Sequence, residues 1–196
     1  MARTQQQRRD ETVARLLDAS IDTIVEVGYA RASAAVITKR AGLSVGALFR
    51  HFDTMGDFMA ATAREVLRRQ IEMGTKRATE IPADRPALDS LLAILRDITH
   101  NPVNAVMYEL MVAARTDEKL RATLQDVLTE FDTKIFGAVR ASADFDNISD
   151  ETLGLLVLTL INTFDGAAIH GAVRPRPEIE EEQIALLASL LNDTYG

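Results

Sequence analysis

The stretch of sequence that decides the fold is Ser33-Ala34-Ala35-Val36-Ile37-Thr38-Lys39-Arg40-Ala41-Gly42-Leu43-Ser44-Val45-Gly46-Ala47-Leu48-Phe49-Arg50-His51-Phe52. Its pattern predicts two short helices, 33–41 and 45–52, joined by a tight turn. Gly42 can adopt the positive φ that a sharp turn requires, and Ser44 suits the cap of the next helix. Leu48 and Phe52 are spaced by four, so they can anchor the second helix and leave Arg50 and His51 facing outward. This layout is typical of a helix-turn-helix, whose second helix enters the major groove of DNA.

Helical periodicity continues on both sides of this stretch, and strand signals are nearly absent. The apolar stripe of the first helix ends at Gly28, and Thr54 with Asp57 forms a weak capping box for a helix reaching about residue 76. Further helices are expected at about 88–98, 102–115, 117–139, 149–164 and 178–192. We therefore predict an all-α protein of about nine helices. A three-helix helix-turn-helix domain over 1–53 is followed by a helical ligand-binding and dimerisation domain over 54–196, with helix 54–77 connecting the two.

Charge is distributed unevenly along the chain, although the net charge is −7. Residues 1–60 hold eight Arg and Lys against seven Asp and Glu, whereas residues 61–196 hold fourteen against twenty-two. The N-terminal third can therefore face phosphate, while the remainder would repel it. The absence of cysteine excludes disulfides and thiolate sites and suits the cytoplasm. No signal peptide is expected, and the apolar segment 153–164 is shorter than the ~20 residues of a membrane span, so we expect no membrane partner.

Many fixed points at fixed spacing give the N-terminal third a specific resemblance. Gly28-Tyr29-Ala30-Arg31-Ala32-Ser33, Ile37 and the run 40–52 resemble the signature of the TetR/AcrR family of transcriptional regulators. That signature holds a Gly-Tyr, a Thr or Ser capping the second helix, an Ala-Gly-Val-Ser turn, a Gly-Thr-Leu-Tyr recognition helix and a His-Phe end. The likeness covers about residues 8–67. It implies a regulator that binds double-stranded operator DNA as a dimer, most often as a repressor.

The resemblance also implies roles for individual residues. Ser33 and Ser44 would lie at helix starts against the DNA backbone, while Arg50 would read a guanine or hold a phosphate. The rest of the predicted DNA-binding set comprises Arg8, Arg9, Lys39, Arg40, Val45, Gly46, Ala47, Phe49 and His51. Three positions depart from the pattern: Phe49 replaces a Tyr, Met55 a Lys and Ala32 a Thr. The first two remove groups that reach phosphate, so binding should be weaker unless Arg8, Arg9 and Arg50 compensate.

The C-terminal part carries a weaker signal for a small-molecule site. Methionines and aromatics with a few polar groups on apolar helices suit an adaptable, largely apolar pocket. The candidate residues are Phe58, Met73, Asn104, Met107, Tyr108, Met111, Phe131 and Asn162. For any one of them, ordinary core packing is the better interpretation. The helix 153–164 is apolar nearly all round, so we predict a homodimer through the last two helices, about 150–170 and 178–192, with burial inside the monomer as the alternative.

Other classes of function have little support in this sequence. The three histidines, His51, His100 and His170, have no HExxH spacing, and there is no G-x-S-x-G elbow or glycine-rich phosphate loop. No catalytic residue, metal site or cofactor is therefore expected. The alternative interpretation of the helix-turn-helix is an ordinary αα corner with no role in DNA binding. A helical interaction module that has lost DNA binding remains the alternative function.

Overall fold

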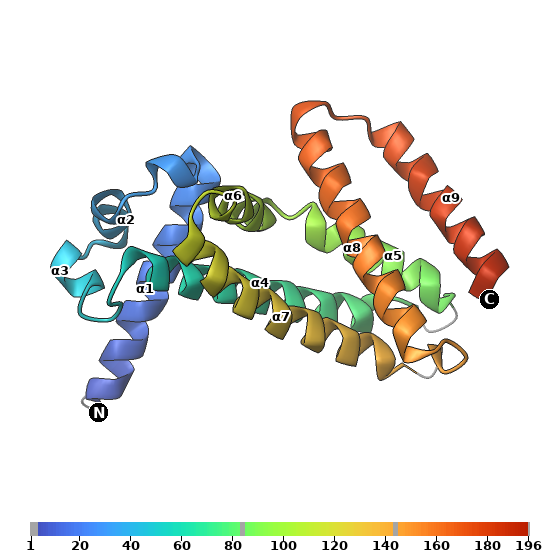
Figure 1. Cartoon of the computed structure of the whole chain (residues 1–196), viewed down its shortest axis with the longest axis horizontal. Coiled ribbons are helices and arrows are strands. Elements are labelled where there is room, and N and C mark those ends of the chain that lie inside the picture. Colours follow the sequence, from blue (N-terminus) through green and yellow to red (C-terminus); the bar gives the residue numbers. More distant parts are fainter. Residues whose placement is uncertain (1–3, 83–84, 143–144, 196) are drawn as a thin grey trace. The chain divides into compact units, whose positions relative to one another are not determined.

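A computed structural model describes residues 4–82, 85–142 and 145–195, and over these residues it contains nine α-helices and no strand (Figure 1). The prediction of an all-α protein is confirmed. The helices are α1 Gln5–Val27, α2 Ala34–Ala41, α3 Val45–Leu48, α4 Met55–Glu80, α5 Ala87–Thr99, α6 Ala105–Ala114, α7 Glu118–Arg140, α8 Asp150–Val173 and α9 Pro177–Tyr195. Two 3₁₀ turns, Tyr29–Arg31 and Pro102–Asn104, precede α2 and α6.

The chain packs as two compact units. Unit 1 comprises Met1–Arg68 with Pro102–Leu128, and unit 2 comprises Arg69–Asn101 with Thr129–Gly196. The long helices α4 and α7 each belong to both units. These units are defined by how the chain packs, whereas the predicted boundary between residues 53 and 54 separates the DNA-binding part from the ligand-binding part. That functional division stays a prediction.

Helix starts agree with their sequence signals. Thr54 and Asp57 bond reciprocally, with the Asp57 N–H donating to Thr54 Oγ1 (3.1 Å) and the Thr54 N–H donating to Asp57 Oδ2 (2.9 Å). This confirms the predicted capping box, which satisfies backbone donors that a helix start leaves free. Thr4 and Gln7 form the same arrangement at the start of α1. Because of this cap, α1 begins several residues before the first residue of its apolar stripe.

The core of unit 1 joins the helix-turn-helix to α1, α4 and α6. Its fully buried side chains include Leu16, Ile21 and Ile24 of α1, Ile37, Leu48, Phe58 and Leu110. Each such burial stabilises the fold by roughly 1.5–3 kcal/mol. A buried hydrogen bond from Thr62 Oγ1 to Ser20 Oγ (3.0 Å) satisfies both hydroxyls where α4 faces α1.

The core of unit 2 is built on α5 and α8, with α9 packed against it. Leu153, Val157, Leu160 and Phe164 form the buried stripe of α8. This helix has 24 residues, and its most apolar 18-residue window has a mean hydropathy of 1.6. By length and composition it is therefore long enough to cross a membrane, contrary to the expectation drawn from 153–164 alone. A core helix passes the same test, and here the stripe packs inside unit 2.

The second helix of the helix-turn-helix is shorter than predicted. The sequence favoured a helix over 45–52, but α3 ends at Leu48 and residues 49–51 form a turn. The reason is a change in hydrogen bonding, because the His51 N–H donates to Leu48 O (2.9 Å), a three-residue spacing. Phe52 still closes the segment, since its N–H also donates to Leu48 O (3.1 Å).

Gly42 should be needed for stability because of its backbone conformation. Its φ of +63° is left-handed, and a Cβ there would lie 3.2 Å from Arg15 Nη2. Gly42→Ala should lower the free energy of unfolding by about 1–2 kcal/mol, measured by thermal denaturation followed by circular dichroism.

Gly46→Ala is the matched control for this substitution. A Cβ at Gly46 meets nothing closer than Ser44 Oγ at 3.9 Å, so stability should hold or rise slightly. Equal melting temperatures for the two variants would contradict the role given to Gly42.

Candidate DNA-binding surface and effector cavity

The turn between α2 and α3 is fixed by its own backbone. Gly42 ends α2 in the left-handed conformation, and the N–H groups of Gly42 and Leu43 donate to Lys39 O (3.2 Å) and Thr38 O (2.9 Å). This is a Schellman arrangement, which turns the chain sharply after the helix. Ser44 then caps α3 by accepting the Ala47 N–H at its Oγ (3.1 Å), as the sequence predicted.

The side chains around this turn divide into an inner and an outer set. Ile37 and Leu48 are fully buried and hold α2 and α3 to the core. Val45, Gly46, Phe49 and Arg50 are exposed, while Ala47 and His51 are half-buried. The start of α3 therefore presents small and apolar groups to solvent, followed by a cation.

Cations from two distant parts of the sequence meet beside α3. A shallow surface depression is lined by Arg8 and Arg9 of α1 and by Arg50 and His51 of the turn after α3. Gln5, Gln6 and Thr12 complete its lining. Sequence reasoning missed these three residues, although Gln5 and Gln6 directly precede the two arginines. The depression combines positive charge with amide and hydroxyl donors, the groups that proteins use for phosphate contacts.

The remaining predicted DNA-binding residues have different surroundings. Ser33 is exposed and its Oγ accepts the Val36 N–H (3.4 Å), so it caps α2 as predicted. Lys39 is exposed at the end of α2. Arg40 forms an ion pair with Glu26 of α1, an interaction that a phosphate would have to displace. No simple spacing rule in the sequence signals that pair, because its partners lie on different helices.

The helix-turn-helix is tied to its neighbours within unit 1. The Tyr29 N–H donates to Glu109 Oε2 of α6 (2.7 Å), and Arg15 Nη2 donates to Ala41 O (2.5 Å). Burial, together with the charge of Asp117, raises the pKa of Tyr29. Phe52 and Phe58 pack at a ring-centroid distance of 4.9 Å, which joins the end of the motif to the start of α4. These contacts hold α2 and α3 in one orientation relative to α1.

Unit 2 contains a cavity of about 470 Å³ between α4, α5 and α7. Its lining is mostly aliphatic, with Ile71, Leu91, Ile94, Leu95, Ile98, Ile135 and Val139. Gly74 of α4 lines it too, and a Cβ there would lie 3.1 Å from Ile98 Cδ1. The glycine thus permits α4 and α5 to approach closely beside the cavity. The volume falls in the range of roughly 300–1,000 Å³ typical of small-molecule sites.

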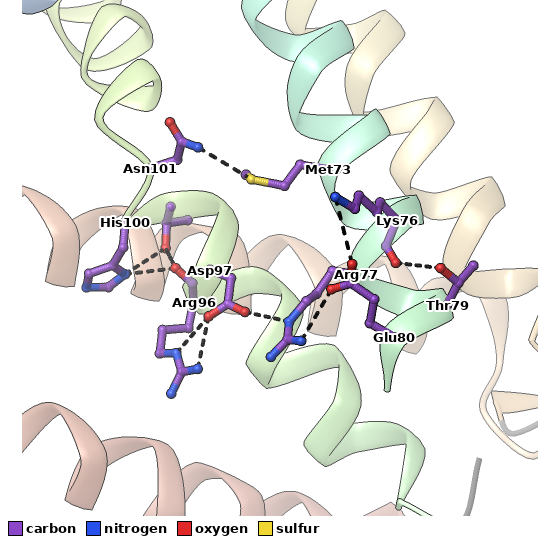
Figure 2. A network of polar contacts seen from close by, with 10 residues as sticks. Met73, Lys76, Arg77, Thr79, Glu80, Arg96, Asp97, His100 and Asn101 are labelled. Carbon is purple, nitrogen blue, oxygen red and sulfur yellow. Dashed lines mark hydrogen bonds and ion pairs between the residues drawn. The ribbon is translucent and has the colours of Figure 1, made fainter. Parts of the chain in front are cut away.

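A polar network fastens α4 to α5 near this cavity. Figure 2 shows Arg77 of α4 and Arg96 of α5 pointing toward Asp97 from opposite sides. Arg77 Nε donates to Asp97 Oδ2 (2.7 Å), and Arg96 Nη2 donates to Asp97 Oδ1 (2.9 Å). Burial by itself would raise the pKa of Asp97, but the two guanidinium groups outweigh it and hold that pKa below its usual range. His100, at the end of α5, pairs with Glu180 of α9.

The eight predicted ligand residues do not gather in one place. Five belong to unit 1 and three to unit 2, and none is among the described residues that line the α4–α5–α7 cavity. Phe58 and Met107 are buried in the core, and Asn104 donates to the Tyr108 hydroxyl (2.5 Å). Met111 and Asn162 are exposed, Phe131 is half-buried, and Met73 Sδ accepts from Asn101 Nδ2 (3.4 Å). Their assignment to a ligand stays a prediction.

Apolar side chains remain uncovered on α8 and α9. Leu155 and Leu158 of α8 are 62% and 46% exposed, and Leu186 of α9 is 59% exposed. Ile169, Val173, Ile179 and Leu190 are exposed as well. Helix α8 therefore buries one side in unit 2, α9 packs a partly buried side against the same core, and both leave an apolar side in water. Over the described part of the chain, no group of three His, Cys, Asp or Glu is placed to hold a metal ion.

Comparison with known proteins agrees with this architecture. Residues 16–62 match the family described as bacterial regulatory proteins, tetR family. The chain is 68% identical over 191 residues to an HTH-type transcriptional regulator of Mycobacterium tuberculosis, covering 97% of this chain and 98% of that protein.

Two solved structures show the same fold. One is the multidrug binding protein EbrR complexed with imidazole (TM-score 0.67, 23% identity, 91% of this chain and 93% of the other). The second is a transcriptional regulator from Saccharomonospora viridis in complex with choline (TM-score 0.67, 16% identity, 94% and 97%). The nine helices, the helix-turn-helix and the near full-length relative lead to one assignment. The chain belongs to the TetR family of helix-turn-helix transcriptional regulators and is not an enzyme.

Proposed function

We propose that this regulator is a cytoplasmic repressor that occupies a two-fold operator as a homodimer and leaves it when a small molecule binds in unit 2. The observation that carries the DNA-binding part is the exposure of Val45, Gly46, Phe49 and Arg50 beside a basic depression. Small residues at the start of α3 permit close approach to base edges, where Val45 can contact a thymine methyl. Arg8, Arg9 and His51 supply phosphate contacts, which give most of the salt-dependent affinity.

The α4–α5–α7 cavity is the proposed effector site. Two structures of the same fold were solved with a small molecule, imidazole in one and choline in the other, which supports a small-molecule effector. Helix α4 lines the cavity with Gln70, Ile71 and Gly74, and it begins directly after the helix-turn-helix. A ligand that prefers one position of α4 would therefore change the placement of α3. It weakens DNA binding only to the extent of its differential affinity for the two states.

The exposed apolar faces of α8 and α9 form the proposed dimer interface. A symmetric pair of these helices would make a four-helix bundle and cover leucines that are now in water. Two-fold symmetry also matches operator half-sites about 34–36 Å apart, or a near multiple. The alternative function is a helical module that does not bind DNA. It predicts that no DNA fragment is bound with a preferred sequence or half-site spacing.

Arg50 should contribute to operator recognition. The operator is first obtained by selecting bound fragments from genomic DNA, which yields half-site sequence and spacing together. Arg50→Ala should then lower operator affinity by about 1–3 kcal/mol in a gel-shift titration, because a guanidinium contact to guanine or phosphate is lost. Arg121→Ala, an exposed cation of α7, is the control. Failure to enrich any fragment at low salt would favour the helical module.

A larger side chain that fills the cavity should block release of the operator by the effector without weakening DNA binding. Ala138 lines the cavity from α7, whereas Ala122 is exposed on the same helix and lies outside it. Ala138→Phe should keep operator affinity but resist release by deproteinised cell extract, measured by fluorescence anisotropy of labelled operator. Ala122→Phe should behave like the unmodified protein. Equal release from both variants would mean that the effector binds outside this cavity.

A charge on the exposed face of α8 should break the dimer. Leu158→Glu would place a carboxylate at the centre of an apolar interface, at a cost of several kcal/mol. We expect a monomer by light scattering and a large loss of operator affinity. Val112→Glu changes an equally apolar side chain of α6 that is 69% exposed and should stay dimeric. A dimeric Leu158→Glu variant would contradict this interface.

A further inference from the structure

We propose that the effector is a small monoanionic amphiphile, with an aliphatic body and a carboxylate head. The inference rests on the proposed role of the α4–α5–α7 cavity as the effector site and assigns the chemical class that this cavity accepts. It follows from three features of the lining: the sign of its charges, the kind of apolar groups, and where each of these lies.

The charged side chains in the described lining have one sign. They are Arg85, which precedes α5, and Lys134 of α7. Arg85 is exposed, and among the described residues its side chain forms no ion pair. Lys134 Nζ donates to Glu130 Oε1 (2.6 Å), one turn earlier on α7 and outside the lining. An anionic group at the cavity can thus meet Arg85, which has no ion pair with another described residue, or Lys134, which is partly neutralised.

The apolar lining suits an alkyl chain better than a quaternary ammonium head. Aliphatic side chains dominate it, and Phe145 is the aromatic residue among the described lining residues. Recognition of quaternary ammonium groups normally uses a cage of several aromatic faces. A cationic ligand would lack that cage and would lie near like charges, which weakens its binding. The cavity therefore discriminates between anionic and cationic amphiphiles by both features.

The position of the charges fits a ligand with its head at the opening. Leu91, Leu95 and Phe145 are buried, whereas Arg85 and Lys134 are exposed. A carboxylate beside either cation keeps contact with water, so it avoids the large cost of burying a charge. The aliphatic body enters among the buried side chains, where each methylene removed from water tightens binding. The cavity of about 470 Å³ is large enough for a drug-sized body.

Three probes with the same tail test the assignment: decanoate, decanol and decyltrimethylammonium. Binding to the full-length protein is measured by isothermal titration calorimetry below the micelle concentrations, and operator release by fluorescence anisotropy. Decanoate should bind most tightly and release the operator, and the cation should bind at least about tenfold more weakly. Ala138→Phe should abolish decanoate binding, which separates the cavity from non-specific surface adsorption.

Charge variants should change decanoate affinity in opposite directions, which a merely apolar cavity would not do. Arg85→Gln and Lys134→Gln should each weaken decanoate about two- to fivefold and leave decanol unchanged, as expected for exposed ion pairs. Glu130→Gln should strengthen decanoate, because Lys134 loses its carboxylate partner. Arg121→Gln, which removes an exposed cation of α7 away from the cavity, should have no effect.

The outcomes separate this inference from the function on which it rests. If decanol or the cation binds as tightly as decanoate, or if decanoate does not bind at all, the anionic class is wrong. The effector cavity still stands in that case, provided that Ala138→Phe blocks release by cell extract. If decanoate binds in the cavity with the predicted charge dependence but never changes operator affinity, the ligand class stands and the release mechanism fails.

Discussion

The burial of Ile37 and Leu48 on either side of the Gly42 turn is the constraint on which the rest of the molecule depends. With both side chains fully buried, the opposite surfaces of α2 and α3 must face solvent. The left-handed backbone at Gly42 then fixes the angle between the two helices, since other residues rarely adopt it. In this arrangement Val45 and Gly46 at the start of α3 are exposed to solvent, as the proposed contact with a DNA groove requires.

The same packing places α1 beside α3, which gives the surface its charge. The net negative charge of the chain argues against a nucleic-acid partner, but Arg8, Arg9, Arg50 and His51 gather in one depression. Local charge governs association with phosphate because exposed charges are screened beyond about 8–10 Å at physiological salt. A phosphate at this depression would therefore meet mainly the charge of Arg8, Arg9 and Arg50.

Unit 2 combines a closed core with two apolar features that remain open. Helix α8 buries Leu153, Val157, Leu160 and Phe164 and still exposes leucines on its opposite side. A helix that is apolar all round needs cover on every side, and the monomer provides it on one. The cavity is a different feature, because its mostly aliphatic lining comes from α4, α5 and α7 and includes Gly74. One surface suits a second chain, and the other suits a small molecule.

Local patterns determined much of this protein before any packing is considered. The period of 3.6 residues, the caps at Ser33, Ser44 and Thr54, and Gly42 predict the helices and the helix-turn-helix, because these signals act within a few residues. Tertiary structure alone decided the end of α3, the pairing of Arg40 with Glu26, and the meeting of α1 with the turn after α3. It also decided the cavity between α4, α5 and α7, whose lining comes mainly from three separated helices and includes none of the eight ligand residues that the sequence predicted. A helical pattern shows which residues are apolar, whereas a cavity depends on how closely distant helices pack.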